Sequence, residues 1–339
     1  MRSDFVIEFK TIMAGALGAI VAFYVGLPAP FLVGPTIVIT LISLLGVATK
    51  VDIPLRNLCF IFIGISMGSG ATPDIIASLI QWPISFLGLA VCIIIIMLGG
   101  AHLLRKLFQY RKKTALLAST PGHLSFVLAL SEDTGGETQK IALVQSMRVL
   151  ALIILVPVFL QFLDMDLPSL NVVQNIMGYQ TTIILGLLAV ALGYVFKKIR
   201  LPAAYLISGM VISTLLHVTN LVDGNLSQWV LVPSFVIMGS LVGTRFSGVK
   251  WETIKNSMGP GAVNILFAFI IAALGAYLVA QITGLPFAQI LLSFAPGGVE
   301  AMIAMSILLN IDPTFVAAHH LIRLFFLATI VPFLFNRKD

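Results

Sequence analysis

Arg148 and Arg323 lie in apolar segments, where a charged side chain is costly. Arg148 follows Lys140 by eight residues, or about 12 Å along a helix, which places it near the middle of a bilayer. A cation at that depth must face the protein interior and have a partner. Two roles stay open for each arginine. The first is functional: the arginine binds an anion or competes with a coupling ion. The second is structural: the arginine forms hydrogen bonds to backbone carbonyls.

Each arginine has polar neighbours on the same face of its helix. Gln145 precedes Arg148 by three residues, and His320 precedes Arg323 by three, with His319 next to it. A histidine beside a fixed cation could serve in proton coupling, because its charge changes near neutral pH. The alternative is a histidine that is hydrogen-bonded inside a helical bundle.

Two Pro-Gly sequences predict breaks in apolar helices. Proline removes a backbone donor and glycine loosens the chain, so Pro121 with Gly122, and Pro296 with Gly297 and Gly298, should interrupt their segments. A break inside a membrane leaves backbone amides and carbonyls unpaired, and the N-terminal ends of half-helices attract anions. The breaks are therefore candidate parts of a binding site.

A carboxylate and a histidine lie next to these breaks. Glu300 could bind a proton, a sodium ion or an arginine, or it could cap a helix at the membrane interface. Its counterpart in the first half is Ser125, so one acidic site is expected rather than two. His123, at the first break, could replace the carboxylate functionally or fill space.

The sequence carries this pattern twice. A shift of 174 places Leu27-Pro28-Ala29 on residues 201–203. A shift of 175 relates Gly64 to Gly239, Gly68 to Gly243, Pro121 to Pro296, Gly122 to Gly297, Arg148 to Arg323 and Pro157 to Pro332. Two homologous halves in an apolar chain are common among secondary transporters. We predict one membrane repeat over residues 9–163 and a second over 180–335.

The composition indicates an integral membrane protein. Apolar residues make up 59% of the chain and charged residues 10%, against about a quarter in a soluble domain. The net charge of +6 comes from short loops between apolar segments and gives no basic arm for nucleic acid. Cys59 and Cys92 lie in apolar stretches and should be buried hydrophobes rather than a disulfide.

Each half contains six apolar segments. They run over 9–25, 30–47, 55–71, 82–104, 113–131 and 139–162, and then over 180–197, 202–218, 228–245, 258–281, 286–309 and 313–335. The loops 164–179, 218–228 and 281–286 contain no Lys or Arg, whereas basic clusters lie in the other long connections. The positive-inside rule requires all of these basic clusters to lie in the cytoplasm. They do so only if the broken segments 113–131 and 286–309 do not cross the whole membrane.

Five crossings per half follow, an odd number that inverts one repeat relative to the other. We predict an all-α integral membrane protein of two inverted repeats, each with about five transmembrane helices and one Pro-Gly-broken segment. That segment is either a re-entrant hairpin or a discontinuous crossing. Both termini are then cytoplasmic.

The residues around the breaks resemble the duplicated membrane domain of the AbrB family. The resemblance rests on Ser119–Gly135 with Val144–Leu150, and on Ala295–Ser306 with His320–Leu324. Each half of that family looks like a Ser-Pro-Gly-Gly break followed by a later helix with an Arg before Leu or Val. Here His123 replaces the second glycine of the first break, and Thr120 and Ala295 replace the Ser.

The resemblance implies a relation to cation/proton antiporters and anion transporters. We expect a secondary transporter of a small solute in a bacterial inner membrane. The sequence does not identify the solute, and an organic anion coupled to an ion or a proton is one candidate. Family labels suggest two alternatives, a membrane-bound ammonia monooxygenase or a membrane regulator of gene expression. The five His residues show no metal-ligand spacing, so no enzyme activity, cofactor or metal is expected. The expected partners are the solute or ion, the lipid bilayer and a second copy in a homodimer, but no nucleic acid.

Overall fold

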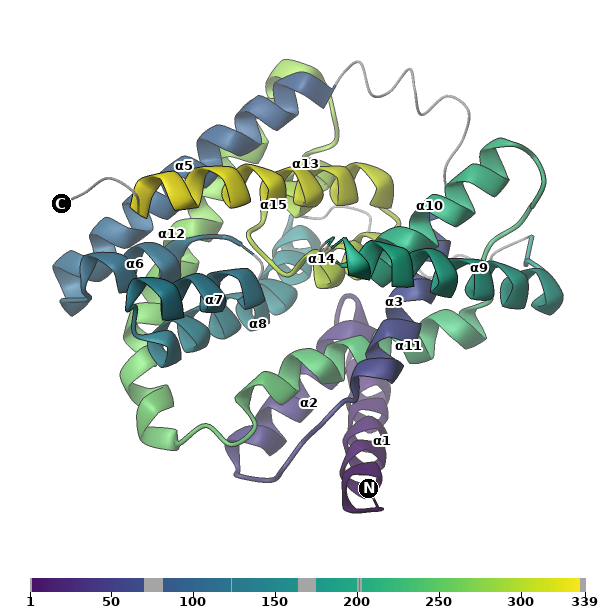
Figure 1. Cartoon of the computed structure of the whole chain (residues 1–339), viewed down its shortest axis with the longest axis horizontal. Coiled ribbons are helices and arrows are strands. Elements are labelled where there is room, and N and C mark those ends of the chain that lie inside the picture. Colours follow the sequence, from purple (N-terminus) through teal and green to yellow (C-terminus); the bar gives the residue numbers. More distant parts are fainter. Residues whose placement is uncertain are drawn as a thin grey trace. The chain divides into compact units, whose positions relative to one another are not determined.

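The computed structural model describes residues 2–69, 82–122, 124–163, 175–199, 201 and 203–335. Within these ranges the regular elements are all helices (Figure 1). They are α1 (Arg2–Val25), α2 (Pro30–Leu44), α3 (Ile53–Gly68), α5 (Trp82–Phe108), α6 (Lys112–Ser119), α7 (Leu124–Thr134), α8 (Thr138–Phe162), α9 (Tyr179–Lys198), α10 (Ala204–Val218), α11 (Gln228–Gly243), the 3₁₀ helix η1 (Thr244–Phe246), α12 (Trp251–Thr283), α13 (Phe287–Phe294), α14 (Val299–Leu308) and α15 (Pro313–Phe335).

Seven of the described helices are long and apolar enough to cross a membrane, namely α1, α5, α8, α9, α11 with η1, α12 and α15. Large apolar side chains such as Leu87, Leu187 and Leu278 are exposed on them, as lipid-facing positions require. The chain is therefore an all-α, multi-pass membrane protein, as the sequence predicts. Helices α2, α3 and α10 have 15, 16 and 15 residues and are shorter, so ten crossings stay a prediction.

The two predicted breaks are confirmed. Helix α6 ends before Thr120 and α13 before Ala295, and both residues leave the helical conformation, with ψ angles of 121° and 124°. The cause is the following proline, whose ring excludes the helical conformation from the residue before it. The four pieces have 8 to 11 residues, or about 12 to 17 Å, which is roughly half the hydrocarbon core.

The helices form two compact units, and each unit takes corresponding helices from both halves of the sequence. The first holds α1 to α3 and α9 to α11, and the second holds α5 to α7, α12, α13, α15, most of α8 and the start of α14. The units therefore cut across the repeats 9–163 and 180–335, whose boundaries stay a prediction.

In the first unit two helix crossings are copies of one packing arrangement. Helix α3 packs on α10, and α11 packs on α2. A Cβ on Gly64 would collide with the carbonyl of Leu206, and a Cβ on Gly239 would collide with that of Leu32. Leu32 and Leu206 are related by the shift of 174. Glycine is required at both crossings because the two backbones approach too closely for any side chain.

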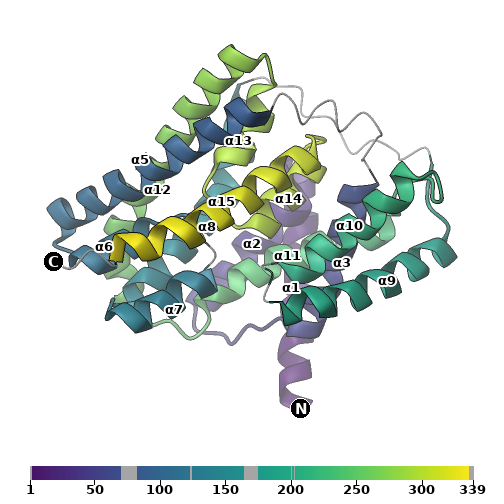
Figure 2. The same ribbon diagram turned by 45° about the horizontal axis from the view of Figure 1, so that its top comes forward.

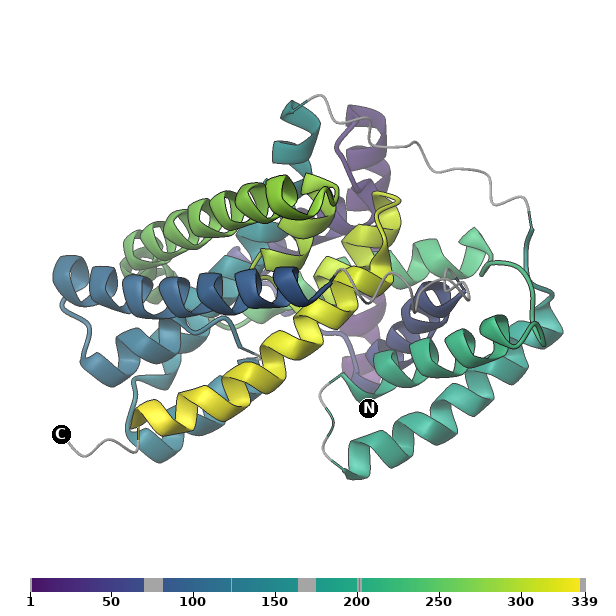
Figure 3. The same cartoon turned by 90° about the horizontal axis from the view of Figure 1, so that it is seen from above.

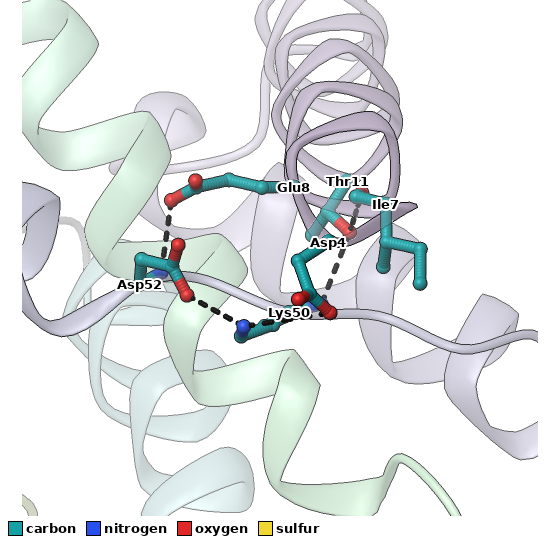
Figure 4. Close-up of polar contacts among 6 residues, drawn as sticks. All are labelled: Asp4, Ile7, Glu8, Thr11, Lys50 and Asp52. Atoms are coloured by element: carbon teal, nitrogen blue, oxygen red, sulfur yellow. Dashed lines mark hydrogen bonds and ion pairs between the residues drawn. The ribbon is translucent and has the colours of Figure 1, made fainter. Parts of the chain in front are cut away.

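The connection from α2 to α3 is held against the start of α1 by polar contacts (Figure 4). The Lys50 amino group lies 2.9 Å from an Asp52 oxygen and 3.8 Å from an Asp4 oxygen. The Asp52 amide donates to Glu8 at 2.8 Å, and the Lys50 amide donates to the Thr11 hydroxyl at 3.2 Å. These contacts hold the first turns of α1 in the first unit. In the same unit α9 lies beside α10 (Figure 2).

In the second unit α5 lies beside α12 (Figure 3). Helix α6 packs on α5, and its counterpart α13 packs on α12. Helix α12 begins at Trp251, earlier than the apolar segment expected from residue 258. Its first turns are polar, and a search for apolar residues does not detect them. This unit contains both breaks and both buried arginines.

Candidate functional site at the helix breaks

Each arginine donates a hydrogen bond to the carbonyl at the break in its own half of the chain. On α8, Arg148 Nη1 donates to the Thr120 carbonyl at 3.3 Å. On α15, Arg323 Nη1 donates to the Ala295 carbonyl at 3.1 Å. Arg323 also donates from Nη2 to the Gly297 carbonyl at 2.8 Å. Both side chains are only 1% exposed, so the broken helices supply the acceptors that a buried guanidinium needs.

The polar residue three positions before each arginine bonds to the short helix that precedes the break in its own half, α6 or α13. Gln145 Nε2 donates to the Leu117 carbonyl at 2.8 Å, and His320 Nε2 donates to the Leu292 carbonyl at 3.0 Å. The proton on Nε2 of His320 follows from chemistry, since a carbonyl only accepts. Nδ1 of His320 is buried and has no hydrogen-bond partner in the described part of the chain. The expected shared helix face is therefore present in both halves.

His319 has a different environment from His320. Its Nε2 lies 2.8 Å from the Ser85 hydroxyl, and its Nδ1 lies 2.8 Å from the Phe315 carbonyl. The Phe315 and Phe86 rings pack against it, with centroid distances of 3.9 and 4.4 Å. His319 is thus held among aromatic rings and does not extend the polar stripe of Arg323.

The charges in this region do not cancel. Arg148 and Arg323 are buried, and Glu300 lies in the first turn of α14, directly after the second break. Glu300 is 8% exposed, and its Oε2 lies 3.9 Å from the position that a Cβ on Gly298 would occupy. Among the buried side chains that the structure describes, two guanidinium groups and one carboxylate leave a net positive charge.

The two breaks contact the helix that carries the arginine of the other half. A Cβ on Gly122 would lie 3.9 Å from Leu327 Cδ1, on α15. A Cβ on Gly298 would lie 3.6 Å from Val149 Cγ1, on α8 next to Arg148. Each break therefore lies next to the helix that carries the arginine of the other half.

The guanidinium groups retain donors that the described residues do not use. Nε of Arg148 and Nε of Arg323 are buried and have no hydrogen-bond partner there. Among the described residues Arg323 is bonded to two carbonyls and Arg148 to one, at a longer distance. Each arginine thus has one buried N–H that a further acceptor could bind.

Of the other predicted site residues, Pro121 and Pro296 act through the backbone by ending α6 and α13. Gly297 supplies a carbonyl to Arg323, whereas a Cβ on Gly122 or Gly298 would make only ordinary van der Waals contact with the neighbouring helix. His123 lies outside the described residues. Within the described ranges no group of three His, Cys, Asp or Glu residues could hold a metal ion.

Two polar residues in the same unit were not among the predicted site residues. Ser119 is the last residue of α6, and Asn264 lies in the apolar part of α12. Both are buried, and their side-chain polar atoms have no hydrogen-bond partner among the residues that the structure describes. An asparagine inside a 33-residue membrane helix is the sequence signal that could have indicated it.

The fold and the site define a duplicated helical membrane protein whose paired buried arginines bind the carbonyls of two broken helices. A family model described as "Transition state regulatory protein AbrB" matches residues 31–338, and the chain belongs to this AbrB family. The chain is 24% identical over 310 residues to "Putative regulator AbrB" of Escherichia coli (strain K12), covering 89% of this chain and 87% of the relative. It is 26% identical over 261 residues to "Uncharacterized protein YhjN" of Bacillus subtilis (strain 168), covering 72% of this chain and 68% of the relative.

Proposed function

We propose that this protein is a secondary transporter of a small organic anion in the inner membrane of a bacterium. The observation that carries the proposal is the pair of buried guanidinium groups at two helix breaks, with Glu300 as the nearby carboxylate. A net positive charge in a low-dielectric site is unfavourable until a counter-ion arrives. A carboxylate would supply that charge and accept from Nε of Arg148.

The duplicated architecture supports the same proposal. Alternating access needs a solute site near the bilayer midplane, formed by broken helices from two related halves. Each broken helix here has pieces about half as long as the hydrocarbon core, so their ends fall near the middle if the helices cross or enter it. The inverted relation of the halves is part of this proposal, as is a homodimer.

A regulatory role is the second candidate, and the names of the family model and of the Escherichia coli relative favour it. A transporter can change gene expression through the level of its solute, so the two roles are compatible. Direct binding of the anion by the purified protein separates a transporter or solute sensor from a protein that acts only on other macromolecules.

The first experiment is a thermal-shift screen of the detergent-purified protein. Lactate, succinate and citrate would be compared with phosphate, ethanolamine and choline. We expect at least one carboxylate to raise the melting temperature of the parent but not that of Arg148→Gln. Arg111→Gln is the matched control, because Arg111 is exposed in the connection before α6. Stabilisation by amines alone would contradict the proposal.

The proposed orientation can be tested separately. A cysteine at Asp223, in a loop without Lys or Arg, should react with an impermeant reagent added outside intact cells. A cysteine at Lys250, in a basic cluster, should be protected. The reverse labelling pattern would contradict cytoplasmic termini and the inverted repeats.

A further inference from the structure

Both ring nitrogens of His217, in the last turn of α10, lie within hydrogen-bond distance of backbone carbonyls. Nδ1 lies 2.7 Å from the Ser213 carbonyl oxygen, and Nε2 lies 3.0 Å from the Gly224 carbonyl oxygen. The Ser213 hydroxyl also lies 3.3 Å from Nδ1, but it donates its own proton to the Ile65 carbonyl at 2.8 Å. Each of these groups therefore faces the ring as an acceptor.

This geometry requires a proton on each ring nitrogen of His217. A neutral imidazole carries one proton, and its second nitrogen is an acceptor, so a neutral ring would place a lone pair against a carbonyl oxygen. A doubly protonated ring donates to both carbonyls at once. The C-terminal end of a helix also favours a cation, because its last carbonyls carry partial negative charge. The surroundings are thus complementary to the imidazolium form.

The Gly224 carbonyl lies next to a junction of three segments of the first unit. The amide of Asn225 donates to the Asn175 carbonyl at 2.8 Å, and the Asn225 carbonyl accepts from the Met177 amide at 2.9 Å. The Asn225 Oδ1 atom accepts from the Ser69 hydroxyl, directly after α3, at 3.0 Å. We call these contacts the Asn225 junction. The imidazole bond to Gly224 connects the end of α10 to it.

The equivalent connection in the first half has no histidine. The shift of 174 relates His217 of α10 to Ser43 of α2. It also relates Asn220 to Gly46, which follow these helices with positive φ angles of 56° and 84°. The Ser43 hydroxyl bonds to the Thr49 hydroxyl at 2.6 Å, in the connection from α2 to α3. Neutral groups make the contact there, so the packing alone does not require a titratable ring.

The charges around His217 permit its protonation. The connection 218–228 contains one charged residue, the exposed Asp223, and its negative charge favours the protonated ring. Helices α3 and α9 pack on α10, and α9 begins at the same end with Tyr179. The other titratable side chains of these three helices lie nearer their opposite ends, namely Arg56, Cys59, Tyr194, Lys197, Lys198 and Tyr205.

We propose that His217 is a proton-binding site that holds the connection between α10 and α11 closed. With the proton bound, Nε2 donates to Gly224 and steadies the Asn225 junction. Without it, the ring keeps the shorter bond from Nδ1 within its own helix, and the junction loosens. Histidine changes charge between about pH 5 and 8, so the connection responds to acidification of its compartment. The assignment of that compartment to the periplasm rests on the proposed orientation.

The test measures amide hydrogen exchange in the junction at two pH values. Exchange of residues 175–177 and 222–227 is followed by mass spectrometry on the detergent-purified full chain at about pH 5.5 and 8. Each rate is corrected for the intrinsic rate at that pH, so that only protection by structure is compared. The parent should be about fivefold better protected at the acidic pH, the factor that corresponds to one net hydrogen bond.

The variants assign the response to one ring. His217→Gln, which binds no proton in this range, should show equal protection at both pH values. His102→Gln, at an exposed histidine of α5, is the matched control and should keep the parent response. His217→Arg provides a second variant if His217→Gln does not fold. Arginine donates at every pH tested, so its protection should be high and independent of pH.

Parent protection that is independent of pH would overturn the proposal. A pH response that survives in His217→Gln or in His217→Arg would overturn it too, because the proton would then bind elsewhere. The measurement uses no anionic solute and no transport, so its failure is distinct from failure of the anion screen.

Discussion

Arg148 and Arg323 bind equivalent carbonyls in the two halves of the chain. In each half the acceptor lies 28 residues before the arginine and ends the first piece of a broken helix. The bonds measure 3.3 and 3.1 Å, and among the described residues only Arg323 adds a second bond, to the Gly297 carbonyl. The arginines therefore hold the breaks with unequal strength, and this asymmetry leads to the first prediction.

Lysine substitutions should affect the two arginines unequally. Lysine keeps the charge but cannot reproduce the two-pronged donation of a guanidinium. Arg323→Lys should leave a buried carbonyl unpaired and cost about 1 to 3 kcal/mol, whereas Arg148→Lys should cost less. Melting temperatures of the two detergent-purified variants check this. Equal losses would mean that the second bond of Arg323 contributes nothing.

His320→Gln should fold, because glutamine at the equivalent position, Gln145, makes the same bond to its short helix. We expect a loss below about 1.5 kcal/mol, the net worth of one hydrogen bond. The matched variant His319→Gln should lose more, because it removes the stacking on Phe315. If transport by His320→Gln keeps the pH dependence of the parent, His320 has no part in proton coupling.

Much of the fold could be predicted from the sequence, because apolar length and Pro-Gly pairs act locally. The predicted segment 139–162 is α8 (Thr138–Phe162), and the break at Pro121 lies where the residue before proline must leave the helix. The assignment of helices to two compact units could not be predicted. It depends on contacts between halves, such as that of Gly64 with Leu206, which no local pattern contains.

The candidate site was predictable in its charged residues but not in its acceptors. A mid-membrane arginine such as Arg148 is conspicuous, because its burial is so costly. Its partner is the carbonyl of Thr120, and a backbone group has no sequence signature. Asn264 was missed for a related reason. The sequence shows an amide in an apolar helix, but its lack of a hydrogen-bond partner among the described residues is visible only in the structure.

The close helix crossings of the first unit predict two equivalent sensitive glycines. Gly64→Ala and Gly239→Ala should each lower the free energy of unfolding by several times RT. The added Cβ would collide with a backbone carbonyl of the neighbouring helix, and that carbonyl cannot move aside. Gly186→Ala in α9 is the control. Nothing lies within 4 Å of a Cβ there, so alanine should be neutral or stabilising by up to about 1 kcal/mol. Thermal unfolding of the three variants tests the packing.

The Lys50 cluster predicts a stability change only at high pH. The hydrogen bond to Asp52, followed by the charge of Asp4, raises the pKa of Lys50 above its ordinary value of 10.5. The protonated form is favoured in the folded state, so the stabilisation is complete below pH 10.5 and is lost as the pH rises through the higher folded value.

Comparing parent and Lys50→Met between pH 7 and 11 tests this, with Lys113→Met as the control for an exposed lysine. The difference in melting temperature should be small and constant up to pH 10.5, then shrink. A difference that already disappears near neutral pH would show that Lys50 does not hold α1 in this way.

The most direct test of the central claim is uptake, into proteoliposomes, of the carboxylate that most stabilises the purified protein. Parent protein should move that anion, and Arg148→Gln should not, although it reconstitutes to the same level and keeps its helical circular dichroism. The account would be contradicted if Arg148→Gln transported the anion at the parent rate, or if the parent bound the anion and moved none of it.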